Sequence, residues 1–102
     1  MEIIHLDETN FEEIVCKEGK VLVDFYATWC PPCKMLGPIL EELANSDVDF
    51  QICKLDIDKA MDITSQFGVM SVPTMILFVD GVEVDRMVGF HNKAQILEFT
   101  NR

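Results

Sequence analysis

The sequence predicts an α/β domain with a mixed β-sheet and helices on both faces, in the order β-α-β-α-β-α-β-β-α. Apolar runs typical of strands alternate with segments of helical period. Strands that are joined through helices run parallel, which predicts a parallel part of the sheet. Asp80-Gly81 between the last two runs predicts a tight hairpin, and therefore an antiparallel part. With 102 residues, we expect one domain over 1–102 and a monomer.

The first three elements follow from short-range signals. Residues 3–6 are expected to form a short strand. A helix follows, which Thr9 or Asn10 can cap in a capping box, and Gly19 is expected to end it. The run 21–26 is almost continuously apolar, as in a strand that is covered on both faces.

A long helix is expected to begin at Cys-Pro-Pro-Cys, residues 30–33, and to run to about Asn45. Its apolar stripe predicts packing against the sheet. Pro38 removes one backbone hydrogen bond inside it and should kink it. The next strand covers 50–57.

The last elements have clear boundary signals. Asp58 is expected to cap a third helix that ends at Gly68. The hairpin strands cover 75–79 and 82–88. Asn92, with a glutamine three residues later, predicts a capping box that begins the final helix.

Charge and hydropathy exclude several function classes. The chain has 8 basic and 18 acidic residues, a net charge of −10, so it lacks the basic patch that binds nucleic acid or an anionic membrane. No apolar stretch approaches the roughly 20 residues of a membrane span. The first residues lack the basic start and apolar run of a signal peptide, so we expect a cytoplasmic protein.

Four cysteines are present, and only Cys30 and Cys33 are closely spaced. Tetrahedral zinc usually takes two close pairs of ligands, and Cys16 and Cys53 supply no second pair, so no metal site is expected. A Cys-x-x-Cys at a helix start is a redox signature, because free N–H groups and the helix dipole stabilise a thiolate. We expect Cys30 to attack and Cys33 to resolve. Cys16 and Cys53 are expected to act as small buried apolar residues, the alternative being a regulatory thiol.

Asp24 is a lone carboxylate inside an apolar strand. Burial disfavours its charged form, so its pKa should rise. A raised carboxylate beside a dithiol can accept and donate a proton at neutral pH. The alternative is a structural carboxylate paired with Lys54 of the next strand.

Several separated motifs resemble the thioredoxin family over the whole chain. They are Val-Asp-Phe-Tyr-Ala-Thr-Trp-Cys-Pro-Pro-Cys-Lys at 23–34, Lys-Leu-Asp-Ile-Asp at 54–58, and the segments 67–74 and 80–89. The resemblance implies the thioredoxin fold and a small cytosolic protein without a cofactor of its own. It implies that the protein reduces disulfides in other proteins and is recharged by an NADPH-dependent flavoprotein, thioredoxin reductase.

The resemblance also implies roles for residues around the thiols. Asp24 would lie behind the resolving cysteine and help to deprotonate it. From the residues alone, Lys54 is expected to be a buried partner that tunes Asp24, the alternative being a solvated charge. Trp29 would form a partly exposed platform rather than a core aromatic. Pro73 would follow a cis bond that leaves the Val72 backbone open to a substrate strand, rather than only marking a strand start. Gly89 would allow close backbone approach, rather than only ending a strand.

One departure concerns Pro31 and Pro32, since the family usually has Gly-Pro between the cysteines. Pro31 removes a backbone N–H beside the thiolate and should change the balance between dithiol and disulfide. Two alternatives to a reductase therefore stay open. One is an oxidant or isomerase tuned by the Pro-Pro loop, and the other is a thioredoxin-like binding subunit without catalysis.

Overall fold

The computed structural model describes all residues, 1–102, and has the predicted order of elements. They are β1 (Ile4–Leu6), α1 (Phe11–Val15), β2 (Lys20–Tyr26), α2 (Pro31–Ala44), β3 (Phe50–Asp56), α3 (Met61–Gln66), β4 (Thr74–Val79), β5 (Val82–Val88) and α4 (Lys93–Thr100). The strands form one sheet in the order β1-β3-β2-β4-β5. The first three are parallel neighbours, and β4 and β5 join antiparallel, which confirms the mixed sheet.

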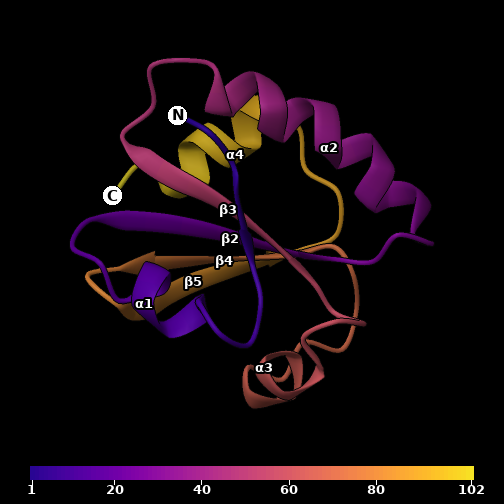
Figure 1. Ribbon diagram of the computed structural model, residues 1–102. Helices are drawn as coiled ribbons and strands as arrows, with labels where there is room; N and C mark the ends of the chain where they lie inside the picture. Colours follow the sequence, from indigo (N-terminus) through magenta and orange to yellow (C-terminus); the bar gives the residue numbers. More distant parts are fainter.

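Helices cover both faces of the sheet, as predicted (Figure 1). The helices α2 and α4 lie on one face, and α1 and α3 lie on the other. Along β2, Val21, Val23 and Phe25 pack on the α1–α3 side, whereas Leu22 packs on the α2–α4 side. Because side chains alternate along a strand, Asp24 points to the same side as Leu22. The strand therefore directs this carboxylate under α2.

The hairpin and the last helix begin as the sequence predicts. Asp80 and Gly81 both have positive φ, 51° and 84°, which a two-residue hairpin turn requires. Asn92 Oδ1 accepts from the Gln95 N–H at 2.9 Å, and Gln95 Oε1 accepts from the Asn92 N–H at 2.9 Å. These two bonds confirm the capping box.

The predicted cap of α1 is wrong. Asn10 occupies the N-cap position, but its side chain makes no capping bond and instead accepts from the Asp7 N–H at 2.8 Å. Asp7 in turn accepts from the N–H groups of Thr9 and Asn10, at 2.8 and 3.1 Å. The side chains of Asp7 and Asn10 thus bond backbone N–H groups within the turn before the helix, because short polar side chains compete for nearby backbone groups.

Two further boundaries differ from the prediction. α3 begins at Met61 with Ala60 as its N-cap, so Asp58 does not cap it. The Asp58 carboxylate instead accepts a hydrogen bond from Trp29, described below. α1 ends at Val15, before Gly19, and Gly19 has φ +97° on the way into β2.

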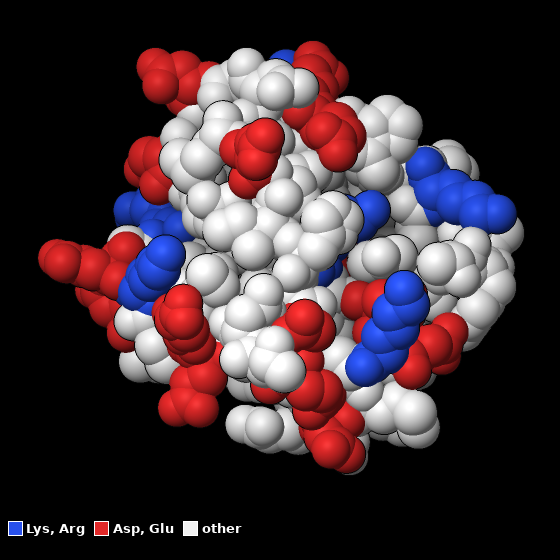
Figure 2. Space-filling view, viewed as in Figure 1, with Lys and Arg blue, Asp and Glu red and all other residues white.

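Acidic side chains outnumber basic ones on the face of the molecule drawn in Figure 2. Figure 2 shows Asp and Glu side chains around much of one face, with fewer Lys and Arg side chains among them. No helix is both long enough and apolar enough to span a bilayer.

Candidate active site

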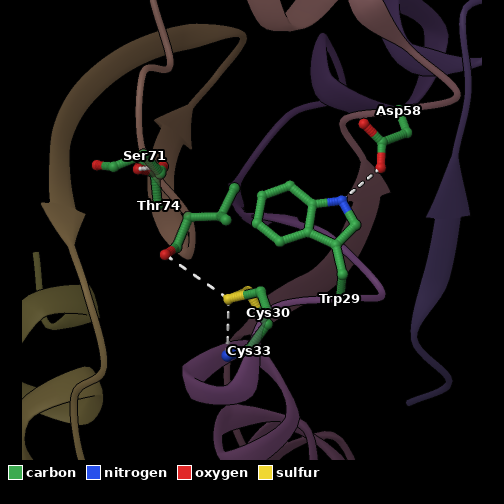
Figure 3. The surroundings of a disulfide bond; sticks show 7 residues. Trp29, Cys30, Cys33, Asp58, Ser71 and Thr74 are labelled. Atoms are coloured by element: carbon green, nitrogen blue, oxygen red, sulfur yellow. Dashed lines mark hydrogen bonds between the residues drawn. A yellow bond between two sulfur atoms is a disulfide. The ribbon is translucent and has the colours of Figure 1, made fainter.

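Cys30 and Cys33 form a disulfide at the N-terminus of α2 (Figure 3). Cys30 is the N-cap residue, with extended backbone, and its Sγ accepts from the Cys33 N–H at 3.2 Å. The Cα atoms lie 5.3 Å apart, because one helical turn brings the two positions together. Pro31 and Pro32 occupy the first two helical positions and have no N–H to donate. The Cys33 amide is therefore the helix-start donor that stabilises negative charge on the Cys30 sulfur.

The cis-proline loop packs against this sulfur. The Val72–Pro73 peptide bond is cis, and the Val72 carbonyl oxygen lies 3.7 Å from Cys30 Sγ. The Gly89 N–H donates to the Pro73 carbonyl at 2.7 Å, which ties the loop to the end of β5. Gly89 has φ +90°, and nothing in the chain lies within 4 Å of where its Cβ would be. Its backbone conformation is therefore what favours glycine here.

Trp29 is an exposed surface aromatic beside the disulfide rather than a core residue. Its side chain is 63% exposed, and its Nε1–H donates to Asp58 Oδ2 at 2.8 Å (Figure 3). This bond fixes the indole between the active-site turn and the segment before α3. Sequence reasoning missed the role of Asp58, because the bond joins residues 29 positions apart and no local pattern signals it.

Asp24 is completely buried under α2, and neither carboxylate oxygen has a hydrogen-bond partner. Removal from water raises the pKa of Asp24 from 3.8 to about 7, and the positive charge of Lys54 partly opposes this. The residue therefore exchanges a proton near neutral pH.

Lys54 lies opposite Asp24 in the parallel register of β2 and β3, but the two side chains form no ion pair. The ammonium instead lies over the ring of Tyr26, 4.4 Å from the ring centroid. Direct pairing with a fully buried carboxylate would strip water from the ammonium. The salt bridge between Asp24 and Lys54 that the sequence allowed is therefore absent. The positive charge of Lys54 still lowers the pKa of Asp24. A surface pocket of about 330 Å³ beside these side chains is lined by Tyr26, Lys54 and Cys33, among others.

The two remaining thiols differ. Cys53 is buried in β3, as expected, and burial raises the pKa of its thiol to about 12. Cys16 is exposed at the end of α1, so its prediction as a buried apolar residue is wrong. Phe11 and Val15 form the buried stripe of α1 with partly buried Ile14, and Cys16 follows the end of that stripe at the surface.

A closely spaced disulfide at a helix start, beside a cis-proline loop and next to a strand that carries a buried carboxylate, is typical of a thiol-disulfide oxidoreductase. The family model Thioredoxin matches residues 2–102. The thioredoxin of Staphylococcus haemolyticus is 46% identical over 103 residues, covering 100% of this chain and 98% of that protein. The thioredoxin of Alicyclobacillus acidocaldarius is 44% identical over 92 residues, covering 89% and 88%.

A comparison with a solved structure supports the same family. The structure of a mutant thioredoxin from Halobacterium salinarum superposes with a TM-score of 0.91 at 35% identity, covering 97% of this chain and 88% of that one. The chain therefore belongs to the thioredoxin family. It is a thiol-disulfide oxidoreductase that reduces protein disulfides through the Cys30–Cys33 pair.

Proposed function

We propose that Cys30 is the attacking thiol and Cys33 the resolving thiol. The Cys30 thiolate attacks one sulfur of a substrate disulfide, forms a mixed disulfide and releases the other substrate sulfur as a thiolate. The Cys33 thiolate then attacks Cys30 Sγ, closes the internal disulfide and releases the second substrate thiolate. The two electrons lost by the dithiol thus reduce one substrate disulfide. The hydrogen bond from the Cys33 N–H to Cys30 Sγ carries this assignment.

Asp24 accepts the proton that Cys33 loses when it resolves the mixed disulfide. A pKa of about 7 supports this role, because the carboxylate is partly ionised at neutral pH and can also return the proton. Its position on the α2 side of β2 supports it as well, since α2 carries Cys33 in its first turn.

Substrates dock as extended segments on Trp29, Val72, Pro73 and Gly89. Val72 lies between α3 and β4, and its backbone makes no backbone–backbone hydrogen bond. It can therefore pair with an added strand, in the manner of β-augmentation. The exposed indole of Trp29 supplies an apolar contact on the other side of Cys30.

An NADPH-dependent thioredoxin reductase regenerates the dithiol. The chain acts in the cytoplasm, as a monomer with a single domain over 1–102. A reducing compartment suits this cycle, since a dithiol donor needs a continuous supply of electrons. The acidic surface favours basic protein partners through long-range attraction and disfavours nucleic acid.

Redox titration tests the direction of the reaction. The protein is equilibrated in glutathione or dithiothreitol buffers and followed by the fluorescence of Trp29, its single tryptophan. A two-electron transition well below about −230 mV is expected for a reductant. A transition near about −180 mV would show instead an oxidant or isomerase, and Pro31→Gly in the same titration would test whether the Pro-Pro turn causes it.

Trapping tests the assignment of the two thiols. Cys33→Ser should accumulate a mixed disulfide with a disulfide-containing substrate protein, whereas Cys30→Ser should form none. Cys16→Ser is the matched control and should turn over normally. Accumulation in Cys30→Ser instead would reverse the two roles, and tight substrate binding that survives both changes would favour a binding subunit.

A further inference from the structure

We propose that Tyr26 is a positioning residue for the proton acceptor: its ring holds the Lys54 ammonium where the charge acts on Asp24 without pairing with it. Tyr26 ends β2, and Lys54 lies in β3. The contact between the ammonium and the ring, at 4.4 Å, is the observation that carries the proposal.

The strands bring these groups to one side of the sheet. β2 and β3 are parallel neighbours in which Asp24 lies opposite Lys54 and Tyr26 lies opposite Asp56. Side chains two apart on a strand, and residues opposite each other on paired strands, point to the same face. Asp24, Tyr26, Lys54 and Asp56 therefore all project on the side that α2 covers.

The Tyr26 ring can bind the Lys54 ammonium without removing most of its water, whereas the Asp24 carboxylate cannot. Asp24 is fully buried and has no hydrogen-bond partner, so an ammonium could reach it only by losing most of its water. Tyr26 and Lys54 are only half-buried and line a surface pocket of about 330 Å³. Over the ring, the ammonium keeps part of its hydration and gains a cation–π contact.

The groups lie within electrostatic reach of one another. Lys54 lowers the pKa of Asp24 against the larger effect of burial, and burial, Asp56 and Asp24 all raise the pKa of the Tyr26 hydroxyl. α2 contributes Cys33 and Lys34 to the same pocket, and Lys34 is the other cation there. Lys34 is exposed, whereas Lys54 is half-buried and lies opposite Asp24 in the register of β2 and β3. Lys54 is thus the cation whose charge acts on the carboxylate, and the ring limits where that charge can go.

Loss of the ring should release the ammonium to water. A lysine ammonium is strongly hydrated and sits on a flexible stem, so without the ring it moves away from Asp24. The carboxylate then ionises at a higher pH, and fewer molecules have an ionised acceptor at neutral pH. This consequence for turnover rests on the proposed role of Asp24, whereas the position of Lys54 does not.

The test measures the titration of Asp24 directly, in the oxidised protein, from the ¹³C signal of its carboxyl carbon. Tyr26→Leu should raise the midpoint by about half a pH unit, which is about a threefold change in the ratio of ionised to protonated Asp24. Tyr26→Phe keeps the ring and should leave the midpoint unchanged. Lys54→Met removes the charge and should raise the midpoint at least as far.

The double variant separates the action through Lys54 from a change in packing. With Lys54→Met already present, Tyr26→Leu should cause no further rise. An equal rise in both backgrounds would show that the ring acts on Asp24 independently of the Lys54 charge, and would overturn the proposal. A fall in the midpoint of Tyr26→Leu alone would overturn it too, because the carboxylate would then have gained water or the ammonium would have closed on it.

The design also separates this proposal from the proposed function. If the midpoints move as expected but the pH profile of mixed-disulfide resolution does not follow them, Tyr26 positions Lys54 and Asp24 is not the proton acceptor. If the midpoints do not move, the proposal fails, whatever Asp24 does. Unfolding midpoints of all variants show whether each one is folded.

Discussion

Replacing the buried acid should make the protein more stable at alkaline pH. In the folded chain the pKa of Asp24 is raised to about 7 from its ordinary value of 3.8, because burial removes water from the carboxylate. One pKa unit corresponds to about 1.4 kcal/mol, so ionising Asp24 costs the folded state about 4 kcal/mol. This is a large fraction of the stability of a domain of this size.

The sign follows from proton linkage. The folded state binds the Asp24 proton more tightly than the unfolded state, so low pH favours folding. This contribution is fully present below pH 3.8, declines as the pH rises, and is lost above about pH 7. The neutral amide of Asp24→Asn does not titrate, so the variant lacks this decline.

The variant should therefore differ from the parent chain chiefly at high pH. A buried amide without partners costs about 1–3 kcal/mol, which offsets part of the gain. We expect Asp24→Asn to be less stable than the parent near pH 4 and more stable at pH 8. The difference in unfolding free energy between the two proteins should change by about 4 kcal/mol over that range.

Guanidinium unfolding of the oxidised proteins at pH 4, 6 and 8 measures this difference. Groups common to both proteins cancel in the comparison. Asp47→Asn, at an exposed carboxylate, is the matched control and should track the parent at every pH. Parallel curves for Asp24→Asn and the parent would refute the reasoning, since Asp24 would then have the same pKa in the folded and unfolded chains.

Three further predictions concern the surroundings of the site and the fold. Asp58→Ala removes the acceptor of the Trp29 indole, so the fluorescence anisotropy of Trp29 should fall while stability changes by about 1 kcal/mol or less; unchanged anisotropy would mean that packing alone holds the ring. In the oxidised protein, iodoacetamide should label Cys16 rapidly and Cys53 only on unfolding, as mass mapping would show. Asn92→Ala breaks the capping box and should lower the unfolding free energy by about 1 kcal/mol, whereas Asn92→Ser should largely retain it.

The order and type of the elements could be predicted from the sequence because local signals mark the strands, turns and helices. Apolar runs, the Asp80-Gly81 turn and the Asn92 capping box each act within a few residues, and each one forms. The position of Asp24 under α2 follows from the alternation of β2. The predictions that failed concern side chains that have several possible partners within reach. Asp58 could cap a helix or accept from an indole, and only the tertiary structure decides between these.

The contacts of Lys54 at the site were likewise beyond what the sequence alone could predict. The sequence places a lysine and a buried carboxylate in neighbouring strands, and opposite charges at paired positions favour a salt bridge. Burial reverses that preference here, since the carboxylate lies too deep for a hydrated ammonium, and the Tyr26 ring offers an alternative. A direct bridge would pull the pKa of Asp24 well below neutrality and leave it unable to return a proton. The unpaired acid therefore lowers stability above neutral pH, and the same raised pKa is what the proposed proton exchange with Cys33 requires.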